Sequence, residues 1–365
     1  MKGYPSGFGL NFRKGVSHQK LLANVSPWIP RRLKVSASRM LGFRTRVETE
    51  YQLTKIARSN STIIAGPWLG EVGFELLYWI PFLTWVASRF EIDRRRIVAV
   101  SRGGPELWYR RIAGSYCDVF DYFDPEEFRR ANEKRRMEIG EQKQIQRSDL
   151  DEDVIDKVVA VVGTSKTDVL HPSLMYQLYR RFWWGHASSD SVRACARFEP
   201  FQKSEPHEVL GDLPSEFVAV KFYFNDCFPS TETNRDFVRT AVDSLARSIP
   251  VVSLATGLTL DEHDSYEVPS LRDISGLVEA RSNLEVQSAI VARAKAFVGT
   301  YGGFSYLSPF LGVPSIGLHS DPKGFARTHY ELALAAFDEW GNQLLRNIDV
   351  AAPDALDQLT AGVGV

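Results

Sequence analysis

The residues best suited to chemistry form a glycine turn late in the chain, Thr300-Tyr-Gly302-Gly303-Phe-Ser305. A short apolar run at 296–299 predicts a buried strand before the turn, and a helix at 304–311 and a strand at 314–318 follow. Because Gly302 and Gly303 have no β-carbon, the backbone can turn tightly and come close to a ligand. The helix would point its first N–H groups at that ligand, which suits a phosphate or diphosphate. A tight strand–helix turn without a ligand is the alternative.

Carboxylates in the N-terminal half are candidates for a general base. Strand 61–66 leads into a loop that contains Gly70, Glu71 and Gly73. Glu71 lies inside this glycine loop, so its carboxylate can face the open side and is the first candidate. Glu75 falls in the first turn of the next helix, where interaction with the helix dipole is its structural alternative. Asp226, which follows a later strand, is the third candidate.

Further polar residues follow the strands of the C-terminal half. Lys221 stands in the apolar strand 217–224, which ends at Asn225. A cation there could offset charge on a leaving phosphate; a lysine that reaches water at the sheet edge is the alternative. Strand 250–255 ends at Thr256 and Gly257, and the residues after it could contact a nucleotide or form a polar loop: Asp261, Glu262 and His263.

Two other features have mainly structural interpretations. His171 precedes Pro172 at the start of a predicted helix, so a structural role is favoured over contact with an acceptor or phosphate. The Asp-x-Asp patterns at Asp149, Asp151 and Asp153 resemble a metal site, but no strand leads into them. We interpret them as solvated charge, and we expect no metal and no cofactor.

Composition narrows the class of protein. With 365 residues, the chain is long enough for two domains, and its net charge of −1 gives no reason to expect nucleic-acid binding. The three cysteines fit neither a disulfide framework nor a zinc motif, and favour a reducing compartment. The most apolar run, 74–87, is too short to span a bilayer, and no signal peptide is expected. The sequence therefore predicts a cytoplasmic protein.

The N-terminal segment departs from this neutral balance. Residues 1–47 contain ten Lys and Arg and no acidic residue. Such a segment, interleaved with large apolar residues, could contact the inner face of an anionic membrane through residues 1–46. A solvated basic arm packed loosely on the fold is favoured, because Pro27 and Pro30 interrupt a long amphipathic helix.

Strands and helices alternate twice along the chain, which predicts an α/β fold with parallel sheets. The first alternation has strands at 61–66, 97–101 and 118–123, and a long apolar helix at 74–87 that Pro81 should kink. The predicted divisions are a basic arm at 1–58, an N-terminal Rossmann-like domain at 59–205 with a charged helical insertion at 124–156, a C-terminal Rossmann-like domain at 206–345, and a tail at 346–365. In such sheets ligands bind beyond the carboxyl ends of the strands, here in an interdomain cleft.

Two Rossmann-like halves together with the segment AKAFVGTYGGFSYLSPFLGVPSI at 294–316 resemble the GT-B-fold glycosyltransferases, in particular heptosyltransferase-like and O-fucosyltransferase-like members. The resemblance implies a nucleotide-sugar donor in the C-terminal domain, a glycan or lipid-linked acceptor in the N-terminal domain, and no obligatory metal. It places Thr300, Gly302, Gly303 and Ser305 on the donor diphosphate. The sequence Lys221-Phe-Tyr-Phe stands where the fucosyltransferase-like pattern has a His and an Arg, so a fucosyl donor is not indicated.

Three functions follow from these observations. The first is a glycosyltransferase of polysaccharide biosynthesis, with tryptophans of the N-terminal half as stacking surface for an acceptor. The second is a nucleotide-sugar epimerase of the same architecture, which would need no acceptor. The third is a non-catalytic protein that binds carbohydrate or nucleotide.

Overall fold

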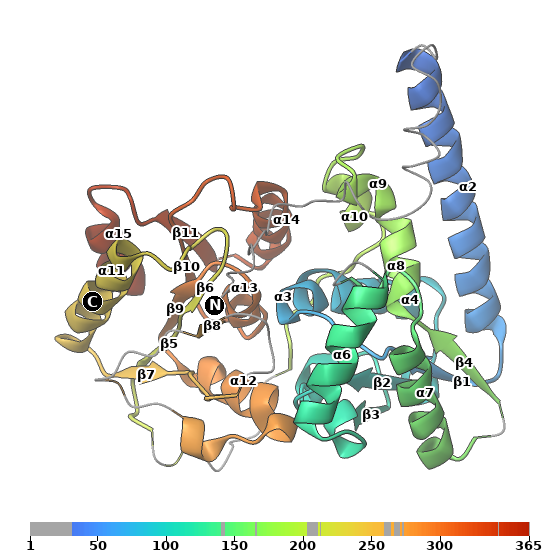
Figure 1. The fold of residues 1–365 in the computed structure, drawn as a ribbon, viewed down its shortest axis with the longest axis horizontal. Coiled ribbons are helices and arrows are strands. Elements are labelled where there is room, and N and C mark those ends of the chain that lie inside the picture. The colour runs from blue at the N-terminus through green and yellow to red at the C-terminus, as the bar shows by residue number, and fades with distance from the viewer. Residues whose placement is uncertain are drawn as a thin grey trace.

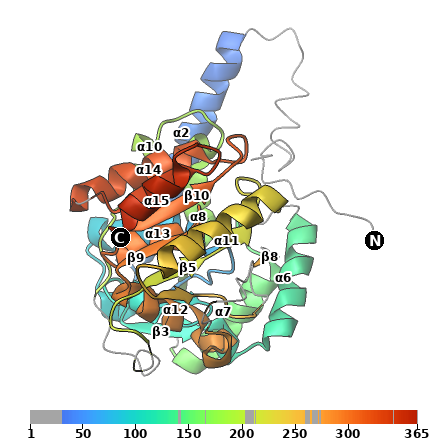
Figure 2. The same ribbon diagram turned by 90° about the vertical axis from the view of Figure 1, so that its left-hand side faces the viewer.

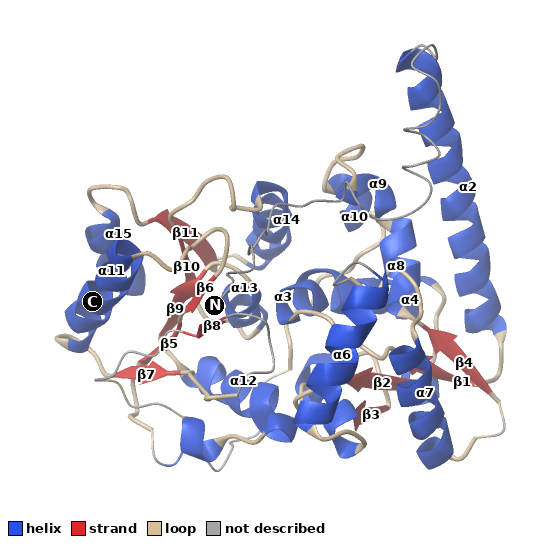
Figure 3. Ribbon diagram, in the orientation of Figure 1, coloured by secondary structure: helices blue, strands red, loops and turns tan. Residues whose placement is uncertain are grey.

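The structure is a computed structural model that describes residues 31–139, 143–164, 166–202, 211, 213–258, 264–265, 271, 274–341 and 343–364. Two α/β halves lie side by side, the N-terminal one in blue and green and the C-terminal one in yellow to red (Figure 1). Each half is built on one parallel sheet (Figure 3). The predicted α/β fold, with one parallel sheet in each of two Rossmann-like halves, is confirmed. The predicted boundary at 205/206 lies outside the described residues.

The N-terminal sheet has the strand order β3-β2-β1-β4. Its strands are β1 (Thr62–Ala65), β2 (Ile97–Ser101), β3 (Ser115–Asp118) and β4 (Thr167–Leu170), and all neighbours are parallel. The two inner strands read TIIA and IVAVS, because helices cover both faces of a parallel sheet and both sets of side chains are buried. The third strand ends where we predicted it to begin, since Val119–Asp121 forms a 3₁₀ turn. The edge strand β4 was not predicted.

A long irregular helix follows β1. It consists of α3 (Val72–Phe74), a π-helical stretch (Glu75–Trp79) and α4 (Ile80–Arg89). Pro81 has no N–H to continue the hydrogen-bond ladder, which explains why regular α geometry is lost just before it. The sequence predicted a kink at Pro81; what the structure has there is a π-helical stretch that ends two residues before it.

The predicted charged insertion at 124–156 is only partly a solvated excursion. It contains α6 (Pro125–Ile139) and the first half of α7 (Asp149–Val162). Val154, Ile155 and Val158 of α7 are buried against one face of the N-terminal sheet, in a cluster that includes Ile64 and Val98. Helix α7 is thus a covering layer of the core, which the density of charge in its sequence concealed.

Helix α2 (Arg31–Arg58) precedes β1 and has 28 residues, and the other remaining helices of the N-terminal half are short. The predicted loose arm is therefore wrong for this part, since Thr49, Leu53 and Ala57 of α2 are buried. The short helices are α5 (Glu106–Tyr109), α8 (Pro172–Leu178), α9 (Arg180–Trp183) and α10 (Asp190–Arg193). Among the described residues, no helix has the length and apolar character needed to cross a membrane.

The C-terminal sheet has the strand order β11-β10-β9-β5-β7, again parallel throughout. The strands are β5 (Val218–Lys221), β7 (Val251–Ser253), β9 (Ala296–Thr300), β10 (Ser315–His319) and β11 (Leu345–Asp349). A small antiparallel pair, β6 (Tyr223–Phe224) and β8 (Asp264–Ser265), stands beside it. The helices are α11 (Glu232–Ala246), α12 (Asn283–Arg293), α13 (Gly303–Phe310), α14 (Arg327–Phe337) and α15 (Ala355–Val363).

The predicted C-terminal tail at 346–365 is wrong as a description of the fold. Most of it forms β11, which pairs with β10, and α15, whose Ala355, Leu359 and Val363 are buried. Helices α11 and α15 lie next to one another over the same side of the sheet (Figure 2). The last residues therefore complete this half.

Candidate functional site

The start of α13 forms the centre of the candidate site. Gly302 has φ +138°, and a β-carbon on it would lie 2.3 Å from the hydroxyl oxygen of Tyr223, so only glycine fits. The Gly302 N–H donates to the Ser305 hydroxyl, which itself donates to the Gly302 carbonyl. Among the described residues, the N–H groups of Gly303 and Phe304 have no acceptor. These two groups could receive an anion.

The two hydroxyls predicted to hold a diphosphate are engaged within the fold. Thr300 is fully buried; its hydroxyl donates to the Tyr223 carbonyl at 2.7 Å and accepts the Tyr223 N–H at 3.1 Å. Ser305 is equally buried and closes the turn of Gly302. Both side chains shape the turn in this structure, so the backbone amides, more than the hydroxyls, are the groups offered to a ligand.

Lys221 lies next to this turn, at the carboxyl end of β5. Its Nζ is 2.6 Å from Oε1 of Gln287 on α12 and 3.9 Å from the ring centroid of Phe304. The ammonium group is therefore held within reach of the first turn of α13, where it adds positive charge to the helix dipole. Gln287, which positions it, carried no signal in the sequence.

The glycine loop of the N-terminal half meets α13 directly. A β-carbon on Gly73 would lie 3.2 Å from the Cα and N of Gly303, and one on Gly303 would lie 3.3 Å from the Gly73 nitrogen. The carboxyl ends of β1 and β9 therefore face one another through α3 and α13, which are adjacent near the centre of Figure 1. Gly70, three residues before Gly73, accepts from Arg102 Nη2 through its carbonyl at 3.0 Å.

The two carboxylates predicted as general bases have different surroundings. Glu71 occupies the position before α3, makes no side-chain cap there, and is near enough to Arg136 to interact with its charge. Glu75 is 1% exposed, and its Oε1 accepts from Ser101 Oγ at 2.5 Å and from the Tyr109 hydroxyl. Burial raises the pKa of Glu75 to about 7. Of the two, only Glu71 has solvent access here.

Beside this contact, a second junction joins the two halves. The Gly103 carbonyl accepts the N–H groups of Leu284 (2.6 Å) and Glu285 (3.3 Å), so a loop of the N-terminal half caps α12. Arg281 pairs with Asp121 at 2.6 Å, and Trp108 Nε1 donates to Ser288 Oγ at 3.0 Å. The loop that contains Gly103 thus joins the two halves.

The other predicted contacts of the C-terminal half have local roles. Asn225 Oδ1 accepts the N–H groups of Cys227 and Phe228 and so forms the turn after β6. Burial, with the nearby Asp321, raises the pKa of Asp226. Thr256 and Gly257 follow β7 in a turn where Gly257 has φ +66°. Asp261, Glu262 and His263 lie outside the described residues.

His171 belongs to a buried network away from the α3–α13 contact. Its Nδ1 accepts the Ser173 N–H and caps α8, so the ring proton is on Nε2, which lies 3.2 Å from Asp151 Oδ1. Gln144 donates to the same oxygen. Burial alone would raise the pKa of Asp151, but the contact with His171 and the hydrogen bonds from Ser148 hold it below its usual value. The structural interpretation of His171 fits this arrangement.

The interpretation of all three aspartates as solvated charge is wrong for Asp151, which is fully buried, whereas Asp149 and Asp153 are exposed. Among the described residues, no group of three or more His, Cys, Asp or Glu side chains is placed to hold a metal ion.

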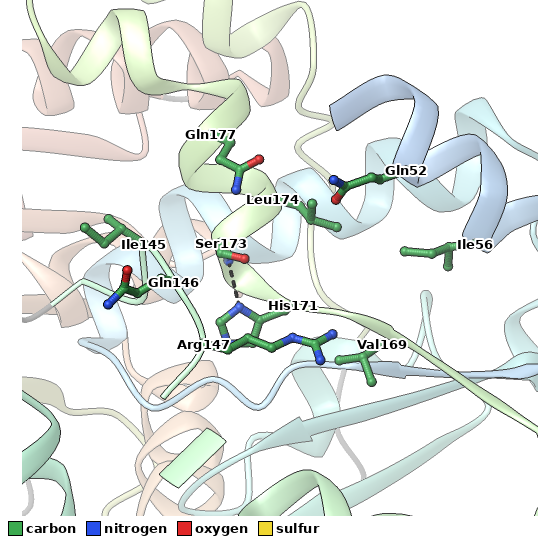
Figure 4. Close-up of a pocket in the computed structure, with 10 residues that line it drawn as sticks. All are labelled: Gln52, Ile56, Ile145, Gln146, Arg147, Val169, His171, Ser173, Leu174 and Gln177. Atoms are coloured by element: carbon green, nitrogen blue, oxygen red, sulfur yellow. Dashed lines mark hydrogen bonds between the residues drawn. The ribbon is translucent and has the colours of Figure 1, made fainter. Parts of the chain in front are cut away.

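His171 also lines a cavity of about 370 Å³ between α2, α8 and the end of β4. Figure 4 shows that its walls mix amides with aliphatic side chains: Gln52, Gln146, Gln177, Ile56, Ile145 and Leu174.

No protein-family model matches the sequence, and no curated protein matches it. Among solved structures, the chain is similar to the bacterial iron-containing dodecameric glycosyltransferase TibC from enterotoxigenic E. coli H10407, with 11% identity, a TM-score of 0.41, and coverage of 73% of this chain and 61% of TibC. It is similar to E. coli ADP-heptose LPS heptosyltransferase II at 12% identity and TM-score 0.45, over 83% and 98% of the two chains. It is also similar to the UDP-GlcNAc 2-epimerase of Methanocaldococcus jannaschii at 9% identity and TM-score 0.38, over 83% and 91%. These values describe a common outline of two α/β halves, and the chemistry proposed below rests on the site itself.

Proposed function

We propose that the protein is a glycosyltransferase that moves a sugar from a nucleotide-diphosphate donor to a hydroxyl group of a glycan or lipid-linked acceptor. The observation that carries this proposal is the start of α13, where two backbone N–H groups have no acceptor among the described residues and the ammonium group of Lys221 lies over the ring of Phe304. This group of donors faces the N-terminal half through Gly73. A diphosphate bound there would lie between the halves, where a second substrate can reach the sugar.

In the proposed reaction, the acceptor hydroxyl oxygen attacks the anomeric carbon and the bond from that carbon to the diphosphate oxygen breaks. The nucleoside diphosphate leaves with the bonding electron pair. The α13 amides and Lys221 stabilise the negative charge that develops on it, so the step needs no metal ion. The proton of the hydroxyl passes to a carboxylate, for which Glu71 is placed better than the buried Glu75.

The closeness of Gly73 and Gly303 bears on how substrates enter. Since neither position has room for a β-carbon without a shift of the neighbour, the contact in this structure is closed. We infer that the donor binds when the halves separate slightly and that closure brings the acceptor side to the sugar. A non-catalytic binding protein would keep the same anion site but would show no turnover.

Calorimetry with a panel of UDP-, GDP-, ADP- and CMP-sugars tests the proposal. We expect one nucleotide to bind to the wild type, and Lys221→Met to weaken its binding by about tenfold or more, the equivalent of one charge-assisted contact. Lys295→Met is the matched control, because Lys295 is an exposed lysine of the same half that contacts the Gly364 carbonyl. The anion site is disproved if no member of the panel binds, or if both variants bind as the wild type does.

Turnover separates the candidate activities. With donor and acceptor present, Glu71→Gln should abolish transfer and leave donor binding intact. Interconversion of a UDP-sugar without an acceptor, followed by NMR, would identify the epimerase instead. Donor binding with neither reaction under any acceptor would identify a binding protein.

A further inference from the structure

The outer face of α2 carries a row of exposed apolar side chains. Phe43, Val47 and Tyr51 follow one another at intervals of four residues and are 70%, 49% and 71% exposed. At this spacing they lie along one side of the helix. Among the residues whose side chains the structure describes, three other large apolar side chains are exposed, and they are scattered over other elements: Met137, Val161 and Leu277. The row on α2 is therefore a local concentration.

A different side of α2 holds it to the fold. Thr49, Leu53 and Ala57 are buried, and the Thr49 hydroxyl lies 3.3 Å from Gln177 Oε1 on α8. At 100° per residue, Phe43, Val47 and Tyr51 lie on average about 120° around the helix from this packed row. Both Figures 1 and 2 show the N-terminal turns of α2 extending beyond the rest of the N-terminal half. The apolar row thus faces away from the protein core.

The charge of the surrounding chain favours one kind of partner. Residues 1–47 contain ten Lys and Arg and no acidic residue. Two of these ten, Arg44 and Arg46, pair with Glu48 and Glu50 on the helix surface, and the segment stays basic overall. A second copy of the same segment would be repelled, whereas a surface of negative lipid headgroups would be attracted.

We propose that the outer face of α2, defined by Phe43, Val47 and Tyr51, docks on an anionic lipid surface. The helix would lie in the plane of the interface, with the three apolar side chains at the acyl-chain boundary. This assigns the contact to a face that extends past the basic segment 1–46. The interaction stands independently of sugar transfer, and its loss would leave the donor site unchanged.

Co-sedimentation of the full chain with vesicles tests the proposal. The wild type should bind vesicles of phosphatidylcholine with phosphatidylglycerol, bind pure phosphatidylcholine at least tenfold more weakly, and lose binding as salt rises. The triple variant Phe43→Gln, Val47→Gln, Tyr51→Gln keeps every charge and should reduce binding to the anionic vesicles at least tenfold. The matched control is Met137→Gln with Val161→Gln, two side chains that are 74% and 66% exposed on other helices, and it should bind as the wild type does.

Circular dichroism and thermal unfolding would verify that both sets of variants are folded, as expected for exposed positions. Nucleotide binding measured without vesicles should be equal in all of them, so that a failure of the lipid proposal is distinguishable from a failure of the donor site. The proposal is overturned if the triple variant binds anionic vesicles as well as the control does. It is also overturned if the wild type ignores vesicles but binds a DNA duplex, because charge alone would then explain the segment.

Discussion

Gly73 and Gly303 meet across the boundary between the two halves, each so close that a β-carbon on either would lie within 3.3 Å of the other's backbone. Gly73 lies in the first turn of the helix after β1 and Gly303 begins the helix after β9, so a strand–helix turn from each sheet meets its counterpart. Both turns present helix N-termini, and two positive dipole ends in contact are better accommodated when an anion lies nearby.

Gly302→Ala should destabilise the C-terminal half by about 3 kcal/mol, because φ is +138° and the new β-carbon meets the Tyr223 hydroxyl. Urea unfolding measures this change. Tyr223→Phe in the same chain removes the obstructing oxygen and should recover part of the loss, while the strain of the backbone remains. Equal losses in the single and double variants would show that the hydroxyl contact is not the cause.

Glu75→Gln should change how stability depends on pH. Burial raises the pKa of Glu75 to about 7 from an ordinary 4.5, so the folded protein keeps a proton that the unfolded chain releases. The wild type therefore loses stability as pH rises from about 4.5 to 7, by about 3 kcal/mol from this group. The glutamine variant, which can still accept from Ser101 and Tyr109, should lack this decline. Glu127→Gln, at an exposed position of α6, should follow the wild-type curve.

His329→Phe should act on the acid side. His329 of α14 is buried among Phe74, Tyr78 and Trp183 of the other half, and burial together with Lys143 lowers its pKa to about 3. The unfolded chain protonates this histidine below about pH 6.5, whereas the folded protein does so only near pH 3. Acid therefore favours the unfolded state, and the free energy of unfolding falls by up to about 5 kcal/mol as pH drops from about 6.5 to 3. The phenylalanine variant should keep more of its stability at pH 4 relative to pH 7. His186→Phe, at an exposed position, should not; identical acid sensitivity in all three proteins would contradict the prediction.

Asp151→Asn should cost about 3 kcal/mol in the free energy of unfolding, because it removes the charge that faces His171 inside the N-terminal half. Chemical denaturation at pH 7 measures the loss. Asp153→Asn changes an exposed residue two positions further along α7 and should stay within about 0.5 kcal/mol of the wild type. A similar cost for both variants would mean that helix charge, and not the buried contact, is responsible.

The sequence predicted those parts of the fold whose pattern is local. Apolar runs bounded by glycine located β1, β2 and β9, and Pro172 with His171 located the start of α8. The order of strands and helices was enough to predict two parallel sheets, since that alternation has few other solutions. Edge strands β4 and β11 were missed, because they are less apolar and are stabilised mainly by the neighbour with which they pair.

Predictions about the site depended on which atoms a fold leaves unpaired, and sequence gives little information on that. The glycine turn was located correctly, but the engagement of Thr300 by the Tyr223 backbone follows from the pairing of β5 with β9. The burial of Glu75 depends on Ser101 and Tyr109, which come from another strand and another helix. The predicted catalytic and donor-binding roles themselves stay predictions until the variants are measured.

The capping of α12 by Gly103 determines where the two halves can part. Separation there would expose the first N–H groups of a helix of 11 residues and break the Arg281–Asp121 pair and the Trp108–Ser288 hydrogen bond. At Gly73 and Gly303, by contrast, no hydrogen bond between the two backbones is found among the described residues. The α12 side therefore has the properties of a hinge axis and the glycine side those of an opening edge, so a small rotation would create space for substrate at the start of α13 first.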